Sequence, residues 1–146
     1  MICTFFGHRD APDTVRPLLR EVLTDLIERQ HVTSFYVGNQ GRFDAMVRSL
    51  LASIAQTHQI EYDVVLAYYP NKPDPLFEAF DTLLPEGIET VPRRFAIDYR
   101  NKWMLEQSDF VVTYVTHSFG GAAKFKKLAE KKNKVVIELS GLAFGN

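Results

Sequence analysis

Short apolar segments alternate with amphipathic helical segments along this chain, and this alternation constrains the fold more than any other feature of the sequence. The apolar segments are typical of buried strands, and the helical segments carry apolar residues at three- and four-residue intervals. No two apolar segments are joined by a two-residue turn, which argues against antiparallel hairpins. The pattern therefore predicts an α/β domain in which helices cover both faces of an open, mostly parallel sheet.

The boundaries of these segments follow from their glycines, prolines and apolar spacing. Strands are predicted at residues 2–6, 35–37, 63–69, 88–91, 110–115 and 135–139. Helices are predicted at residues 14–29, 43–54, 76–82, 96–107 and 120–132. Prolines mark a long connection over residues 70–85, which would either fold over a ligand site as a lid or merely cross the edge of the sheet.

Length, charge and cysteine content limit the class of protein further. The 146 residues show no repeat or composition shift, so residues 1–146 are predicted to form a single domain. The 17 Lys and Arg against 18 Asp and Glu give a net charge of −1, which makes nucleic-acid binding unfavourable, and the lysine-rich segment 124–132 is expected to be a solvated helix face. The single cysteine, Cys3, excludes an internal disulfide. Without an apolar run of roughly 20 residues or a basic leader segment, we expect a cytoplasmic domain with no membrane partner.

Glycine-containing and polar segments follow most of the predicted strands. They are Gly7-His8-Arg9, Gly38 to Asp44, Tyr68 to Lys72, and Thr116 to Gly121. In open parallel sheets, ligands bind outside the carboxyl ends of the strands, where such segments meet. The sequence therefore predicts a ligand site at this edge of the sheet.

The Gly120-Gly121 pair at the start of a predicted helix favours phosphate as part of that ligand. Glycine lets the backbone approach a ligand closely, and the free N–H groups of a first helical turn bind anions. Arg9, Arg42 and Lys72 could add charge-assisted contacts. Each glycine could equally do no more than end a strand or begin a turn.

Individual side chains at this edge also have more than one interpretation. His8 is either a ligand contact, a general acid–base group or a packed histidine. Asp44 either binds a ribose hydroxyl or compensates a helix dipole. His117 could line the site, and Tyr68 and Tyr69 could stack on a base or pack against loops.

Several standard motifs are absent. The sequence has no Gly-x-Gly-x-x-Gly, no Walker-type Gly-Lys-Ser or Gly-Lys-Thr, and Ser118 does not lie in Gly-x-Ser-x-Gly. Its four histidines lack metal-ligand spacing, so no metal site is predicted.

Four short motifs together resemble those of a known family. The opening Thr4 to Arg9 resembles the strand and Gly-His-Arg start of YpsA-like proteins, a branch of the SLOG superfamily named after the Smf/DprA and LOG proteins. The resemblance continues in the same order over nearly the whole chain, at Gly38 to Asp44, at Arg100 to Met104 followed by Ser108-Asp109, and at Gly120 to Ala122. The glycine-rich turn before Asp44 is one residue longer than in the family.

The resemblance implies a Rossmann-like fold, a three-layer α/β/α sandwich, with a pocket for a nucleotide or nucleotide-derived ligand. The phosphate would lie at the Gly120-Gly121 helix start, and no further cofactor is implied. A homodimer is an expectation, because relatives in the superfamily often pair. Carried over position by position, the ligand-binding residues would be Gly7, His8, Arg9, Gly38, Gly41, Asp44, Arg100, Asn101, Gly120 and Gly121.

One relative, the LOG enzyme, hydrolyses cytokinin riboside monophosphates and carries Pro-Gly-Gly-x-Gly-Thr-x-x-Glu. Aligned on Gly120-Gly121, this chain has Lys127 in place of the glutamate. A lysine cannot stabilise an oxocarbenium centre as a carboxylate does. An enzyme of this kind would need another carboxylate, with Asp44, Asp98 or Glu106 as candidates.

The sequence thus leaves several functions open. The first is a sensor or regulator that binds a nucleotide-derived ligand without consuming it. The second is an N-glycosidase acting on a nucleoside monophosphate. The third is a protein-interaction adaptor with a vestigial pocket, and the fourth, DNA handling as in DprA, is disfavoured by the charge.

Overall fold

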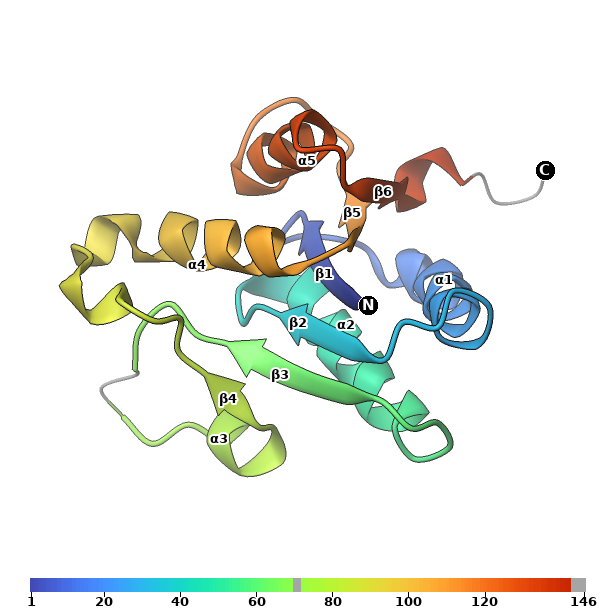
Figure 1. Cartoon of the computed structure of the whole chain (residues 1–146), viewed down its shortest axis with the longest axis horizontal. Helices are drawn as coiled ribbons and strands as arrows, with labels where there is room; N and C mark the ends of the chain where they lie inside the picture. Colours follow the sequence, from blue (N-terminus) through green and yellow to red (C-terminus); the bar gives the residue numbers. More distant parts are fainter. Residues whose placement is uncertain (70–71, 143–146) are drawn as a thin grey trace.

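The computed structural model describes residues 1–69 and 72–142, and it shows a three-layer α/β/α arrangement around one sheet (Figure 1). Six described strands pair in the order β4-β3-β2-β1-β5-β6, and every pairing is parallel. The strands are β1 (Ile2–Gly7), β2 (Ser34–Val37), β3 (Glu61–Val65), β4 (Thr82–Leu83), β5 (Phe110–Tyr114) and β6 (Val135–Glu138). This confirms the predicted Rossmann-like α/β fold.

The helices divide between the two faces of the sheet. The helices are α1 (Arg16–Glu28), α2 (Gly41–Ile54), α3 (Leu76–Ala79), α4 (Arg93–Gln107) and α5 (Gly121–Lys131), with short 3-10 turns η1 (Asp13–Val15), η2 (Ile88–Thr90) and η3 (Leu139–Gly141). Buried residues of α1 and α2 share one core cluster, and those of α4 and α5 share another.

Among the described residues, no helix has both the length and the apolar character that a bilayer crossing requires.

Adjacent residues of β1 supply the two cores. Successive side chains of a strand point to opposite faces, so the apolar run at residues 2–6 can be buried on both sides. Phe5 stacks on Phe35 in the α1/α2 core, with ring centroids 6.1 Å apart. Phe6 stacks on Phe125 of α5 in the other core, at 5.3 Å.

The strand order contains one topological switch. The chain proceeds outward from β1 through β2 and β3 to β4, then returns to the other side of β1 to form β5 and β6. The loops after β1 and β5 therefore diverge at neighbouring strand ends, which is where open α/β sheets bind ligands. The β1–β5 register pairs Gly7 with Tyr114, so both loops begin at the same height.

The predicted fourth strand at residues 88–91 is wrong. Residues Ile88–Thr90 form the 3-10 turn η2, because Gly87 before it has a left-handed φ of +83° and Pro85 accepts the N–H of Ile88. The fourth strand is instead Thr82–Leu83, at the end of the segment predicted as a helix. The third strand also ends earlier than predicted, at Val65. Residues 70 and 71 of the proposed lid and residues 143–146 of the tail lie outside the described residues.

Candidate functional site

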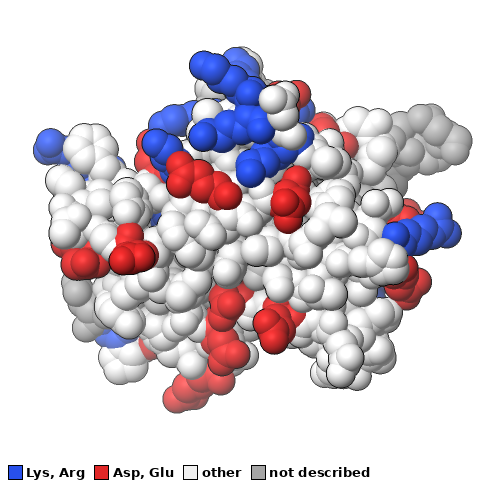
Figure 2. All heavy atoms as spheres, in the orientation of Figure 1, with Lys and Arg blue, Asp and Glu red and all other residues white. Residues whose placement is uncertain are grey.

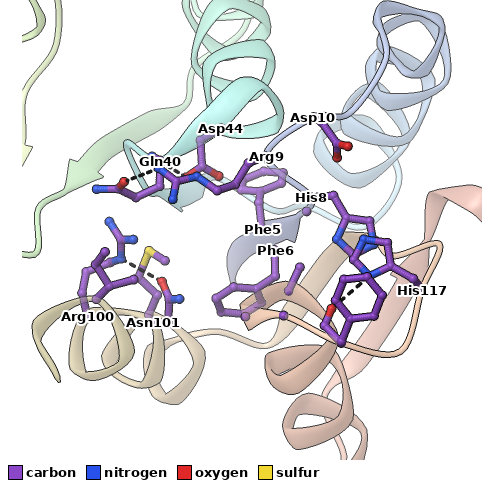
Figure 3. Close-up of a pocket in the computed structure, with 17 residues that line it drawn as sticks. Phe5, Phe6, His8, Arg9, Asp10, Gln40, Asp44, Arg100, Asn101 and His117 are labelled. Atoms are coloured by element: carbon purple, nitrogen blue, oxygen red, sulfur yellow. Dashed lines mark hydrogen bonds between the residues drawn. The ribbon is translucent and has the colours of Figure 1, made fainter. Parts of the chain in front are cut away.

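A pocket of about 350 Å³ opens at the carboxyl edge of the sheet, at the switch between β1 and β5 (Figure 3). In Figure 3, Gln40 and Asp44 lie at one end, His8 and His117 at the other, and Arg100 and Asn101 face them from α4. Eight of the ten sequence-predicted residues line this pocket. They are Gly7, His8, Arg9, Asp44, Arg100, Asn101, Gly120 and Gly121.

The two remaining predicted residues, Gly38 and Gly41, lie behind the pocket wall. A Cβ at Gly38 would be 2.7 Å from Asp44 Oδ2 and 3.1 Å from Arg100 Nη1. Gly41 has a φ of +85°, and a Cβ there would be 2.7 Å from the Cα of Arg9. Both glycines therefore allow pocket side chains to approach the backbone, rather than facing the pocket themselves.

Arg100 is a buried cation at the pocket wall, only 2 % exposed. Its Nη1 donates to Val65 O at 3.0 Å and to Asn39 Oδ1 at 3.1 Å, and its Nε donates to Asn101 Oδ1 at 2.8 Å. No hydrogen bond joins Nη2 to another described residue, and Arg100 is one of the residues that line the pocket.

Asp44 is the buried carboxyl group of the same wall. Its Oδ2 accepts the backbone N–H of Gln40 at 3.0 Å, across the first turn of α2. Burial raises the pKa of the Asp44 carboxyl, while the nearby positive charges of Arg100 and Arg48 and the Gln40 hydrogen bond act in the opposite direction. The carboxyl therefore sits in the kind of environment from which a general acid or a ribose-binding group works.

The start of α5 forms the floor at the opposite side. Gly120 is its N-cap, has a φ of +91°, and supplies no capping side chain. A Cβ added at Gly120 or Gly121 would meet no atom within 4 Å, so both glycines face open space. The N–H groups of the first turn have no helical partner by geometry, and no described backbone acceptor outside the helix takes them. This leaves an anion-binding helix start open to the pocket.

Three stacked rings form the wall beside this helix start. His8, at the end of β1, is 7 % exposed and stacks on His117 with ring centroids 3.6 Å apart. His117 in turn stacks on Phe119 at 3.9 Å, and Phe119 is 70 % exposed at the rim. His8 Nε2 accepts the backbone N–H of Thr116 at 2.8 Å, so the proton of neutral His8 lies on Nδ1.

Arg9 and Gln40 close the end of the pocket near α2. Arg9 Nη2 donates to Gln40 Oε1 at 3.1 Å. The carbonyl of Arg9 accepts the N–H of Arg42 at 2.8 Å, which ties the loop after β1 to the start of α2. The guanidinium of Arg9 thus lies in the same cluster as Asp44 (Figure 3).

Sequence reasoning missed part of the lining. Ile97 and Met104 lie one turn to either side of Arg100 and Asn101 on α4, so their helical spacing was the signal that could have found them. Phe119 lies in the loop segment Thr116 to Gly121, which was expected at the site, but the residue itself was assigned no role. The other unpredicted lining residues are Phe5, Phe6, Asp10, Gln40 and Ala122.

Several residues with proposed roles lie elsewhere. Lys127 is exposed and does not line the pocket, where α5 contributes only Gly121 and Ala122. Of the three candidate carboxylates, only Asp44 lines it: Asp98 pairs with Lys124 on the surface at 2.6 Å, and Glu106 is exposed.

Four further charged or aromatic candidates, Arg42, Tyr68, Tyr69 and Lys72, also lie outside the pocket. Arg42 pairs with Asp13 at 3.6 Å, and Tyr68 is covered by the guanidinium of Arg93 at 3.8 Å from its ring centre. Neither Lys72 nor Tyr69 lines the pocket. Within residues 1–69 and 72–142, no group of three or more His, Cys, Asp or Glu side chains is arranged to hold a metal ion.

Comparison with known proteins defines the fold class. No family model matches the sequence, and no curated protein matches it. Among solved structures, it is similar to the X-ray structure of DNA processing protein A (DprA) from Streptococcus pneumoniae, with a TM-score of 0.70 at 14% sequence identity. The match covers 93% of this chain and 49% of that one, so this chain spans about half the length of its neighbour.

The likeness to DprA shows a shared Rossmann-like fold. Membership of the SLOG superfamily, and of its YpsA-like branch, stays a prediction from the sequence motifs.

Proposed function

We propose that this chain binds a nucleotide or nucleotide-derived ligand in the pocket at the β1–β5 switch, as a sensor or regulator. The observation that carries the proposal is the convergence of an uncapped helix start and a buried guanidinium on one pocket. The α5 start offers N–H groups at Gly121 and Ala122, and Arg100 brings its buried guanidinium to the opposite wall. Two sets of donors facing one cavity suit a ligand that carries phosphate and further acceptors.

The size and remaining lining of the pocket support the same ligand class. A volume of about 350 Å³ lies within the range of small-molecule sites. Asp44 provides an acceptor for hydroxyl groups, and the exposed ring of Phe119 provides a surface on which a base could stack. The pocket thus offers donors for the phosphate, an acceptor for the ribose hydroxyls and an aromatic ring for the base of a nucleotide.

A thermal-shift screen tests this proposal. Nucleoside monophosphates, ADP-ribose, NAD and cyclic nucleotides would be added singly, and each sample analysed for released base. A sensor should melt at higher temperature with a ligand that is recovered intact. A lack of any shift with every compound would reject the proposal and favour the adaptor function.

A variant pair locates the phosphate. Gly121→Asp places a carboxylate at the first turn of α5, where it favours the helix dipole but repels phosphate. We expect this variant to be as stable as the native chain and to lose the ligand shift. Asn133→Asp adds the same charge at the exposed far end of α5 and should keep the shift.

A second candidate function is the N-glycosidase, and Asp44 is the observation that favours it. It is the carboxylate of the three candidates that lines the pocket, and its pKa is raised. If base is released, Asp44→Asn should abolish the release while leaving the ligand shift, because an amide oxygen can still accept from Gln40. DNA handling of the kind that the neighbour's name describes has less support, because the net charge of this chain is −1.

A further inference from the structure

A second concave surface, with no lining residue in common with the pocket, lies between α4 and α5. This groove is about 540 Å³ in volume. Val91, Phe95 and Leu128 are among the apolar side chains that line it. Lys102 from α4 and Lys124 and Lys132 from α5 line it as well, and one acid, Asp98, is paired with Lys124.

The groove contains a large apolar side chain of α4, Phe95, that is half exposed. Phe95 is 51 % exposed, although α4 buries Ala96, Met104 and Leu105. One face of its ring is covered by the guanidinium of Arg94, at 4.8 Å from the ring centre. Large apolar side chains that are concentrated in a concave surface with a polar rim mark interaction sites.

The charge around this groove differs in sign from that of the rest of the chain. Residues 121–134 contain six lysines and one glutamate, which gives +5 and leaves −6 for the remainder of a chain whose net charge is −1. Figure 2 shows the Lys and Arg side chains gathered most densely where Figure 1 places α5, and acidic side chains along the lower part of the view. A partner for the groove should therefore be acidic, and it should contact this face alone.

We propose that the α4/α5 groove docks an acidic peptide segment of a partner protein through one large apolar side chain. That side chain packs between Phe95 and Leu128, and flanking carboxylates meet Lys102 and Lys132. This partner fits better than a nucleic acid because the remainder of the chain, with a net charge of −6, repels a long polyanion. The proposal is independent of the pocket and its ligand.

Selection from a random 12-residue peptide library against the full chain tests the proposal. We expect the selected peptides to contain Asp or Glu on both sides of a Leu, Ile, Phe or Trp. The tightest peptide, labelled for fluorescence anisotropy, should bind at least tenfold more weakly to Phe95→Ser and to Lys132→Glu, and its affinity should fall as salt rises. Phe95 is half exposed, so Phe95→Ser should fold, which circular dichroism checks.

Matched variants make the test specific. Asp98→Asn removes the acid of the groove and frees Lys124, so it should strengthen peptide binding by a few fold. Lys72→Glu makes the same charge change as Lys132→Glu outside the groove and should leave binding within twofold.

Four results would overturn the proposal. One is a selection that yields no consensus or a neutral or basic one, and another is a peptide affinity that survives Phe95→Ser. The third is an oligothymidylate that binds the native chain and not Phe95→Ser, which would assign the groove to nucleic acid. The fourth is a dimer in light scattering that Phe95→Ser converts to a monomer, which would assign it to a second copy of the chain.

Discussion

His8 Nε2 accepts a hydrogen bond from the backbone N–H of Thr116 at 2.8 Å, and this bond joins the end of β1 to the loop that leads into α5. The two residues are 108 positions apart in the sequence. The same imidazole stacks on His117, so His8 holds both the backbone and a side chain of that loop. The loop ends at Gly120, and its position therefore sets the direction of the open α5 start.

Stability should depend on the protonation of His8. Burial and the neighbouring His117 lower its pKa from the ordinary value of 6.5, and Asp10 and Glu138 oppose them more weakly. The unfolded chain therefore takes up a proton at higher pH than the folded chain. The contribution of neutral His8 is fully present above pH 6.5 and is lost as the pH falls below it.

Urea unfolding of the native chain and of His8→Gln between pH 7.5 and pH 5 measures this dependence. The glutamine oxygen can accept from Thr116 without titrating, so the free energy of unfolding of the variant should fall less steeply with decreasing pH. Parallel curves for the two proteins would show that His8 does not titrate in this way.

Gly38→Ala should destabilise the protein and impair the pocket. The added Cβ would lie 2.7 Å from Asp44 Oδ2 and 3.1 Å from Arg100 Nη1, so both buried side chains must shift. Overpacking of this kind costs about 1–3 kcal/mol. Gly141→Ala, where a Cβ meets no atom within 4 Å, is the matched control and should change the free energy of unfolding by less than about 0.5 kcal/mol. Equal stability of the two variants would contradict the close packing behind Gly38.

Arg100→Met should lower the stability of the protein by more than the change in side-chain volume alone would predict. The substitution leaves the acceptors of Asn39, Asn101 and Val65 without this donor and removes the positive charge that most favours the ionised form of Asp44. Unsatisfied buried acceptors cost about 1–3 kcal/mol each, so a loss of about 2–4 kcal/mol in chemical denaturation is expected. A loss below about 1 kcal/mol would show that these bonds contribute little.

Unlike Arg100→Met, Asp44→Asn should not lower the free energy of unfolding at neutral pH. Because the pKa of Asp44 is raised in the folded chain, protonation stabilises the fold, and that stability is lost as the pH rises through the folded-state pKa. At pH 7 the neutral variant should therefore be at least as stable as the native chain, and this advantage should shrink at pH 4. Thermal unfolding at the two pH values measures both effects, and a variant less stable than the native chain at pH 7 would contradict this assignment.

The fold could be predicted from local sequence patterns. The errors of the prediction lie where strand-like and turn-like residues occur together. Strands such as β5 are continuous apolar runs that only a buried parallel sheet accommodates. The segment 88–91 has the apolar residues Ile88 and Val91 at its two ends, but Gly87 before it and Pro92 after it favour a tight turn. The true β4 has two residues, which is too short for a periodic signal.

Site residues that are glycines or charged residues could be predicted from the sequence. Site residues that are ordinary apolar residues could not be recognised so directly. Gly120 and Arg100 are visible in the sequence as a turn residue and a charged helix residue. Ile97 and Met104 look like ordinary apolar positions, and only their spacing of three and four residues from Arg100 and Asn101 indicates that they share the pocket-facing side of α4. The position of the Arg100 guanidinium depends on hydrogen-bond partners from β3 and the loop after β2, which only the folded chain brings together.

If the α5 start binds the phosphate of a nucleotide-derived ligand, backbone amide NMR should detect the contact at the N–H groups themselves. AMP, GMP, CMP and UMP would be titrated in turn into the ¹⁵N-labelled chain. We predict that at least one of them shifts the amide resonances of Gly121 and Ala122 strongly, and that these shifts vanish in Gly121→Asp but remain in Asn133→Asp. Binding that shifts resonances elsewhere and leaves those of the α5 start unchanged would contradict the account.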